Sequence, residues 1–404
     1  MTNDSKLFHP RDQLEAKGYK PDVFGRWIGP DGDIMLPLYE GRMIGQFDFS
    51  KKGWVSGRGR AAVWREIPFD NKTIEPQYLI SSLDLEEYPA IAVPTFAYMP
   101  ISSATNTATL IGAYLNYFPS GHSISHLRLA GYIGEHLRLT SMLTSFATDY
   151  VARQKIGGIN MSWFAVEELP IPAGENQIQW RRLVLGSARL TLLHRRFAPE
   201  WLRLKSLLPE FGQREWKNWW AVTEADRLRL RVEIDAICAD LYGLDPDDFD
   251  WIVRDDPSDP KGFWRVDKEL PYRERLTGLA AAAFRTLKEG KWSAESAGTL
   301  SNDDFFAAIG IPELTSNAAA KSAGLSEPLI SKRRGCPVWE PEKFTPDDPR
   351  FGWTWEHCWN DAVALLGSEQ AVQEVVSGAA ENNAKKELAH KTEELPIPGG
   401  LFNE

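Results

Sequence analysis

The chain has 404 residues, 43% hydrophobic and 25% charged, an ordinary composition for a globular protein with two or three domains. No run of about 18 apolar residues occurs, which excludes a predicted membrane-spanning helix. The formal net charge of −10 argues against nucleic-acid binding unless positive charge is concentrated in particular segments.

Charge is indeed segregated along the chain. Residues 51–65 contain five Lys or Arg and no acid, whereas residues 341–404 contain twelve acids and five bases. Residues 181–208 contain seven bases against the single acid Glu200. Because 51–65 is basic and much of the negative charge lies in 341–404, we expect that 51–65 can face phosphate. For 181–208 two interpretations stay open, a phosphate-facing surface and a solvated helix face.

The first 130 residues are predicted to be β-rich, because short apolar runs alternate with Pro, Gly and Ser. Residues 107–118 fit a helix or a strand. A helix is expected from the apolar stripe Leu139, Met142, Leu143, Phe146 and Tyr150. A polar loop at 153–158 and a strand at 159–166 should follow, and the prolines of 169–172 should end that strand.

Residues 177–290 are predicted to be helical. The clearest helix begins at Thr223, where Asp226 completes a partial capping box, and ends near Gly243. Its buried stripe is expected to be Leu230, Ile234, Ile237 and Leu241. A short helix can form within 293–310, and the polar segment 379–394 should fray or be disordered.

The motifs of several enzyme classes are absent from the sequence. There is no P-loop, HExxH or GxSxG motif, and no Asn/Asp-Pro-Pro-Tyr/Phe loop of an adenine methyltransferase. The isolated Gly57-Arg58-Gly59 lacks a strand–helix context, and the acids Asp12 and Glu15 lie too close to Lys17 for a nuclease site. The three cysteines show no CxxC spacing. We therefore predict no catalytic residue, no metal site and a reducing, cytoplasmic location.

Three polar segments suit DNA recognition, although each can also be a solvated turn. They are residues 51–65, with Trp54 and Trp64 among the bases, residues 101–106 and residues 153–158. Basic side chains are expected to contact phosphates, amide and hydroxyl side chains to contact base edges, and glycines to let backbone amides approach a phosphate. The predicted DNA-binding residues are Lys51, Lys52, Arg58, Arg60, Ser103, Thr105, Asn106, Arg153, Gln154, Lys155, Gly157 and Gly158.

Three phrases together resemble one protein family. They are LPLYEGRMIGQFD at 36–48, DYVARQKIGG at 149–158 followed by SWF at 162–164 and LPIP at 169–172, and RVEIDA at 231–236 with LYGL at 241–244. In order and spacing they are similar to type IIG restriction enzymes and to BREX- and DISARM-type adenine-specific DNA methyltransferases. The resemblance covers about residues 1–290. It departs from the family at Phe49, where the first phrase ordinarily continues with histidine.

The resemblance implies a target-recognition region that lies downstream of a methyltransferase domain. It implies an α+β fold, with a mixed, mostly β DNA target-recognition domain at 1–175 followed by a helical domain at 176–290. We expect an irregular, acidic and partly flexible extension at 291–404. S-adenosylmethionine and base flipping would belong to a methyltransferase partner or a missing domain, and this chain would be a split subunit, a truncated product or a fragment. Adenine N6 methylation is implied by the resemblance alone.

Two other functions stay open at the level of sequence. The chain can be an assembly subunit of a defence complex that does not bind DNA, with its acidic tail docked on a basic partner. It can also be a nuclease with an unrecognised site. Salt-dependent binding to duplex DNA separates the first alternative from a DNA reader, since phosphate contacts release counterions.

Overall fold

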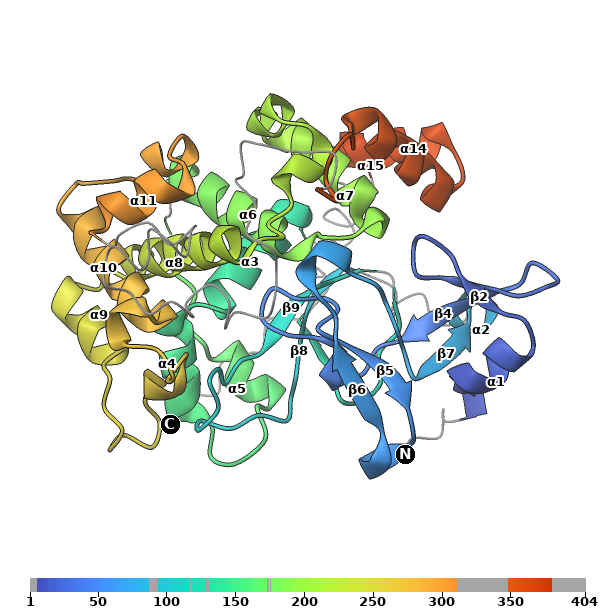
Figure 1. The fold of residues 1–404 in the computed structure, drawn as a ribbon, viewed down its shortest axis with the longest axis horizontal. Helices are drawn as coiled ribbons and strands as arrows, with labels where there is room; N and C mark the ends of the chain where they lie inside the picture. Colours follow the sequence, from blue (N-terminus) through green and yellow to red (C-terminus); the bar gives the residue numbers. More distant parts are fainter. Residues whose placement is uncertain are drawn as a thin grey trace, which may run out of the picture.

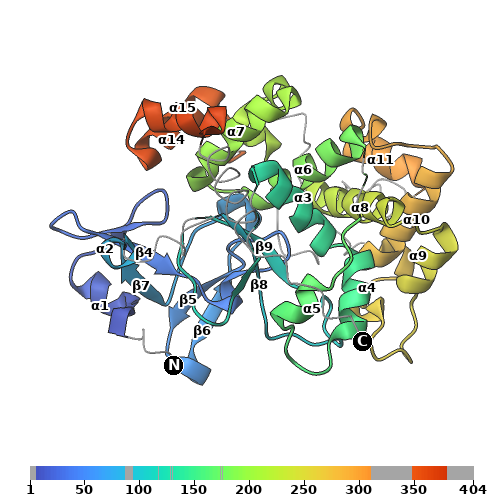
Figure 2. The ribbon, with the colours of Figure 1, turned by 180° about the vertical axis from the view of Figure 1, so that it is seen from behind.

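A computed structural model describes residues 6–86, 94–116, 118–127, 129, 131–172, 174, 176–310 and 348–379. Strands occupy one side of the molecule and most helices the other, as Figures 1 and 2 show from opposite directions. Helices and strands both contribute substantially, so the predicted α+β class is confirmed.

The N-terminal part contains a five-stranded antiparallel sheet in the order β1-β7-β4-β3-β2. Its strands are β1 (His9–Pro10), β2 (Lys20–Pro21), β3 (Trp27–Ile28), β4 (Ile34–Leu38) and β7 (Tyr78–Ser81). Alternating apolar residues of β4 face its core, and Leu36 pairs with Ile80. Two short helices, α1 (Arg11–Ala16) and α2 (Ser82–Glu86), flank this sheet.

Two further antiparallel units complete the β structure. β5 (Lys52–Ser56) and β6 (Val63–Glu66) form a hairpin with a bulge between Trp54 and Ser56. β8 (Thr95–Tyr98), β9 (Gly112–Leu115) and β10 (Ser125–Leu127) form a sheet in the order β10-β8-β9. The ambiguous segment 107–118 therefore contains a strand, β9, which is buried along its whole length.

The helical part of the molecule begins at residue 133. Its helices are α3 (Ile133–Leu143), α4 (Phe146–Lys155), α5 (Trp163–Glu167), α6 (Gln177–Thr191), α7 (Ala198–Leu207), α8 (Glu224–Leu241), α9 (Pro246–Ile252), α10 (Leu276–Lys288), α11 (Asn302–Ala308), α14 (Trp355–Leu366) and α15 (Glu369–Ser377). The start of α8 at the Thr223 cap and its apolar stripe agree with the sequence prediction, and the short helix expected within 293–310 is α11.

Three local predictions are corrected. The helix expected through Tyr150 is two helices, because Ser145 caps a new one by accepting a hydrogen bond from the Thr148 amide. The strand expected at 159–166 is wrong, since the second half of that segment belongs to α5, which Ser162 caps. The extension at 291–404 is not irregular throughout, because α14 and α15 pack onto α7. Most of 379–394, where fraying was expected, and the basic residues 332–334 lie outside the described residues.

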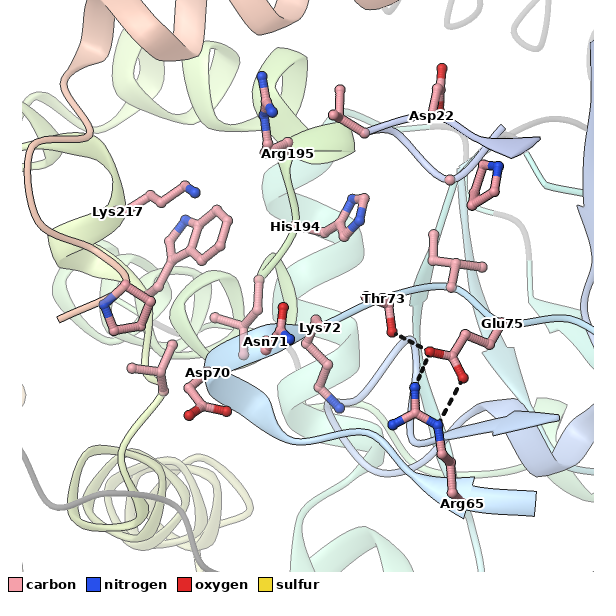
Figure 3. Close-up of a pocket in the computed structure, with 18 of the residues that line it drawn as sticks. Asp22, Arg65, Asp70, Asn71, Lys72, Thr73, Glu75, His194, Arg195 and Lys217 are labelled. Atoms are coloured by element: carbon pink, nitrogen blue, oxygen red, sulfur yellow. Dashed lines mark hydrogen bonds and ion pairs between the residues drawn. The ribbon is translucent and has the colours of Figure 1, made fainter. Parts of the chain in front are cut away.

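The hydrophobic cores do not separate at the predicted boundary near residue 175. One cluster joins Phe47, Met142 and Phe146 to α8 and α10, and another joins Tyr39 and Phe49 to α6, α7, α14 and α15. Where the N-terminal strands meet the helical part, a cavity of about 810 Å³ opens between them (Figure 3). No helix in the described ranges combines the length and apolar character needed to cross a bilayer.

Candidate nucleic-acid interface

The second and third predicted segments are joined by backbone hydrogen bonds. The Ser102 amide donates to the Ile159 carbonyl at 2.9 Å, and the Met161 amide donates to the Pro100 carbonyl at 2.7 Å. Ile101 forms an isolated antiparallel bridge with Asn160. Two segments whose paired residues lie 57 to 61 positions apart in the chain therefore form one surface, which we call the paired-loop surface (residues 100–109 and 154–164).

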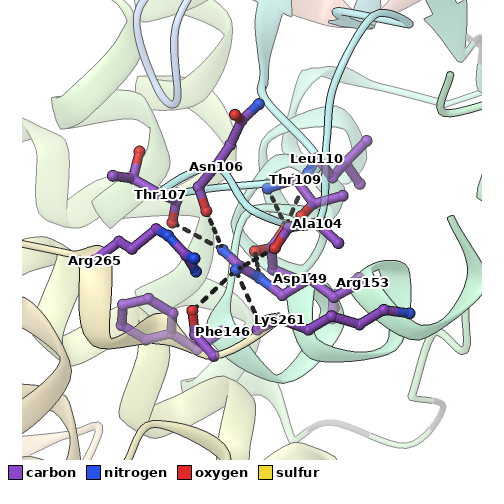
Figure 4. A network of polar contacts seen from close by, with 12 residues as sticks. Ala104, Asn106, Thr107, Thr109, Leu110, Phe146, Asp149, Arg153, Lys261 and Arg265 are labelled. Atoms are coloured by element: carbon purple, nitrogen blue, oxygen red, sulfur yellow. Dashed lines mark hydrogen bonds and ion pairs between the residues drawn. The ribbon is translucent and has the colours of Figure 1, made fainter. Parts of the chain in front are cut away.

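Arg153 holds this surface together from beneath. Its guanidinium donates to the carbonyls of Ala104 at 3.0 Å, Asn106 at 2.9 Å and Thr107 at 3.0 Å (Figure 4). It also reaches the Lys261 carbonyl at 3.1 Å, and its side chain is 0% exposed. The prediction that Arg153 contacts phosphate is therefore wrong, because its donors are already used by backbone oxygens inside the protein.

Asp149 completes the same network from the preceding turn of α4. Its Oδ2 accepts from the Arg153 Nε at 2.9 Å, while its Oδ1 accepts from the amides of Thr109 and Leu110 at 2.8 Å each. Carbonyls of 104–107 thus accept from the Arg153 guanidinium, and amides of 109–110 donate to the Asp149 carboxylate. Both buried charges therefore have the hydrogen-bond partners that they require. The four-residue spacing of Asp149 and Arg153 is the sequence signal that would have indicated an intramolecular ion pair.

The other predicted residues of these two segments are accessible. Thr105, Asn106, Gln154, Lys155, Gly157 and Gly158 are exposed, and Ser103 is half-buried with its Oγ 2.9 Å from the Thr105 Oγ1. In Figure 4 the Asn106 side chain points away from Arg153. Space around both glycines is open, and neither has a positive φ, so nothing within the chain requires glycine at these two positions.

Lys155 already has a partner on the surface. Its Nζ lies 2.8 Å from the Glu168 Oε2, and this hydrogen bond holds the pKa of Glu168 below its usual value. Exposed pairs of this kind contribute little to stability. The ammonium group is therefore free to exchange this partner for a phosphate at small cost.

The first predicted segment is the β5–β6 hairpin and the residues around it. Arg58 and Arg60 are exposed near its end, whereas Lys51 and Lys52 are half-buried at its base. Arg58 pairs with Asp12 at 3.4 Å, with both side chains more than half exposed. The hairpin end and the segment around α5 lie along the lower edge of the molecule in both Figure 1 and Figure 2. The ribbons of the hairpin end and of the segment around α5 thus lie toward the same edge of the molecule.

A smaller polar pocket connects the hairpin base with the paired-loop surface. Its volume is about 380 Å³, and its lining includes Lys51, Thr107, Arg231 and Asp235. Burial raises the pKa of Asp235 to about 7, although its Oδ1 accepts a hydrogen bond from the Phe146 amide at 2.8 Å. The pocket contains both acids and bases, so its charge does not select an anion.

Three of the seven bases in the second basic stretch point into the protein. Arg182 donates to Glu233 at 2.7 Å, Arg189 to the Trp219 carbonyl at 3.0 Å and Arg196 to the Asn116 carbonyl at 2.7 Å. All three arginines are buried. For them, both interpretations of 181–208, the phosphate-facing surface and the solvated helix face, are wrong.

Exposed apolar side chains, which the sequence did not indicate, border the paired-loop surface. Ile101 is 59% exposed, Ile159 68%, Trp163 55% and Phe164 61%. The rings of Trp163 and Phe164 lie with centroids 3.7 Å apart. Because this segment was expected to be a strand, its exposed aromatic pair was missed.

The structure offers no alternative metal centre within the described ranges, where no three His, Cys, Asp or Glu side chains gather as ligands. Cys238 and Cys358 are free and buried, and Cys336 lies outside the described residues. No family model, curated protein or solved structure matches the chain.

Proposed function

We propose that this chain reads DNA sequence for an adenine-N6 DNA methyltransferase of a restriction–modification or phage-defence system. The observation that supports this proposal is the paired-loop surface. Its hydroxyl, amide and basic side chains are exposed together on a frame fixed by the buried Asp149–Arg153 pair. Such side chains on rigidly held loops are what base edges and phosphates require. The sequence resemblance supplies the methyltransferase part of the proposal.

The proposed roles follow the exposure of each residue. Thr105, Asn106 and Gln154 contact base edges, and Lys155 contacts a phosphate. The amides of Gly157 and Gly158 approach the backbone of the duplex. Ser103 supports Thr105, to which it is hydrogen-bonded.

The hairpin extends the same contact. Arg58 and Arg60 reach phosphates further along the duplex, and Lys51 and Lys52 add positive charge at its base. Trp163 and Phe164 border this contact, where an aromatic side chain can pack on an unstacked base. Double-stranded DNA and a methyltransferase subunit or domain are the proposed partners. That partner carries S-adenosylmethionine and flips the target base.

Binding of a fluorescently labelled duplex, followed by anisotropy at several salt concentrations, tests this proposal. The affinity should fall steeply between about 50 and 200 mM salt, because bound phosphates release counterions. Lys155→Glu should weaken binding and lower the slope of log affinity against log salt by about one.

A matched control is Lys291→Glu. Lys291 is also exposed and also paired with a glutamate, Glu289, at 2.7 Å, but it follows α10. This variant should bind duplex as the parent does. A parent protein with no salt-dependent affinity for duplex would exclude the proposed DNA contact.

The exposed apolar side chains favour one second candidate, a non-DNA-binding assembly subunit. Ile101, Ile159, Trp163 and Phe164 form the kind of apolar border that marks a protein–protein interface. For such a subunit the parent would not bind duplex, and Trp163→Ala would instead weaken association with the methyltransferase chain. For a DNA reader, Trp163→Ala lowers duplex affinity.

A further inference from the structure

The cavity of about 810 Å³ is distinct from the proposed DNA surface. It lies where β3, the β5–β6 hairpin, residues 193–195, residues 217–222 and residues 349–353 meet. Its size falls in the range of roughly 300–1,000 Å³ that small-molecule pockets occupy, and such pockets favour junctions between structural parts.

One charged donor in the wall of this cavity has no acceptor among the residues that the structure describes. The ammonium group of Lys217, whose residue is 7% exposed, makes neither a hydrogen bond nor an ion pair within the same residues. A buried donor without an acceptor is costly, so this wall lacks the oxygen atoms that would satisfy it.

Lys217 lies among aromatic rings instead of carboxylates. Its Nζ is 3.3 Å from the ring centroid of Trp353 and 4.7 Å from that of Trp220. Burial, and then the positive charge of Arg195, lowers the pKa of Lys217 to about 7. An anion beside this amine would restore its charge and provide the missing acceptor.

The acids around the cavity do not fill this role. Glu75 is held by Arg65 and by the Thr73 hydroxyl at 2.9 Å. Asp22 pairs with Arg26 at 2.7 Å, and Arg195 is paired with Asp361 at 2.8 Å. In Figure 3 the Asp70 carboxylate points away from Lys217.

We propose that this cavity binds a planar ring that carries an anionic group, the chemical class of a mononucleotide. The anionic group lies beside the Lys217 Nζ, and the ring lies against the indoles of Trp27, Trp54 and Trp220. This site shares the β5–β6 hairpin with the proposed DNA contact, through Trp54, Val55 and Arg65, but it includes no predicted DNA-binding residue.

Calorimetric titration of the whole chain with deoxyadenosine monophosphate tests the site. Saturable binding should be observed, and Lys217→Gln should weaken it at least tenfold. Deoxyadenosine, which lacks the anion, should bind the parent at least tenfold more weakly than the monophosphate does. Its affinity should be the same for the parent and for Lys217→Gln. Inorganic phosphate, which lacks the ring, should also bind more weakly than the nucleotide.

The matched control is Lys205→Gln. Lys205 also lies over an indole, 4.4 Å from the Trp355 ring, but does not line the cavity. This variant should bind the nucleotide as the parent does, and its melting temperature shows whether loss of a lysine–indole contact alone affects folding. Absence of saturable binding to the folded parent, or equal binding by Lys217→Gln, would overturn the proposal.

A second measurement identifies the source of the ligand. If the ligand is a free nucleotide, Lys217→Gln leaves affinity for a single-stranded oligonucleotide unchanged. If the ligand is a nucleotide within a strand, the oligonucleotide loses affinity in the variant together with the monophosphate. Duplex binding that depends on Lys155 but not on Lys217 would separate this site from the proposed DNA surface.

Discussion

At the scale of single residues, Arg153 joins α4 to two segments that are distant in the sequence. Its guanidinium is shared between the carboxylate of Asp149 and backbone carbonyls of the 104–107 and 261–262 segments. It also lies 4.0 Å from the ring centroid of Phe263. A planar group with five donors can serve this many acceptors, which a lysine ammonium cannot. The residue therefore positions the proposed contact residues without touching DNA itself.

Replacing Arg153 should destabilise the protein strongly. Arg153→Met leaves the Asp149 charge and several carbonyls buried without donors, and breaking a buried ion pair in this way costs about 3–5 kcal/mol. Arg153→Lys should recover only part of that loss. Urea unfolding gives the comparison, with Lys155→Met as the exposed control, which should stay within about 0.5 kcal/mol of the parent. A free energy of unfolding for Arg153→Met close to that of the parent would mean that the network contributes little.

Glu200 is a buried acid whose protonation should affect stability. Its Oε1 contacts the Asn116 amide and lies 3.4 Å from the Tyr114 hydroxyl, while its Oε2 has no hydrogen-bond partner in the described part of the chain. Burial raises the pKa of Glu200 from 4.5 to about 7. The geometry agrees with a protonated carboxyl group, because an ionised one would leave a charged oxygen without a donor.

The sign of the resulting pH dependence follows from that direction. The folded state holds the proton more tightly than the unfolded state, so this stabilisation is complete below pH 4.5 and is lost as the pH rises through about 7. Glu200→Gln keeps the shape and does not titrate. The free energy of unfolding of the variant minus that of the parent should therefore rise by up to about 3 kcal/mol between pH 5 and pH 8. Other titrating groups cancel in this difference, and a constant difference across the range would contradict the assignment.

At the scale of elements, local signals predicted what local interactions determine. For α8 the cap, the apolar stripe and the end were all confirmed, since the Thr223 Oγ1 accepts from the Asp226 amide at 3.1 Å within one turn. The burial of its charged residues was not predictable, because their partners are distant in sequence. Arg227, for example, donates to the Leu190 carbonyl at 2.9 Å.

The errors at α4 and α5 have a related cause. The apolar stripe continues through Phe146 and Tyr150, so periodicity did not reveal the break that Ser145 makes by capping α4. α5 has only five residues, which is too short for a helical period to show. A capping serine followed by a short helix is a weaker signal than β-branched and aromatic content, and the latter wrongly favoured a strand.

The candidate site was predictable as a set of segments but not as a surface. The polar composition of 101–106 and 153–158 marked both, and most of their residues are exposed. Their pairing through Ser102 and Ile159 is a long-range contact without a local signature. The role of Arg153 depends on carbonyls more than 45 positions away in the sequence. Its charge alone therefore predicted a phosphate contact, whereas these carbonyls hold it inside the protein.

At the scale of the whole molecule, the strand and helical parts share two hydrophobic clusters. Phe49, which precedes β5, packs its ring against Phe197 beside α7, with centroids 5.0 Å apart, and against His194 at 5.9 Å. The same cluster includes Trp201 and, from the C-terminal helices, Cys358 and Val372. A domain boundary near residue 175 would cut through these contacts, so the two predicted domains should not unfold independently.

Phe49→Ala tests this coupling, because Phe49 belongs to the N-terminal part while the buried tryptophans of its cluster, Trp201, Trp216, Trp219 and Trp220, belong to the helical part. Removing a buried phenyl group costs about 3–5 kcal/mol. If the parts share one cooperative unit, urea midpoints from tryptophan fluorescence and from the helical circular dichroism signal should coincide in the parent and shift together in the variant. If the parts are separate, the helical signal keeps its midpoint while only the N-terminal strands are weakened.

Leu14→Ala serves as the control, since Leu14 is buried in a small cluster with Trp27, Met35 and Leu79 that does not reach the helical part. Leu14→Ala should destabilise the N-terminal sheet. If the two parts unfold together, it should lower the urea midpoint of the helical circular dichroism signal less than Phe49→Ala does, because Leu14 does not contact the helical part directly.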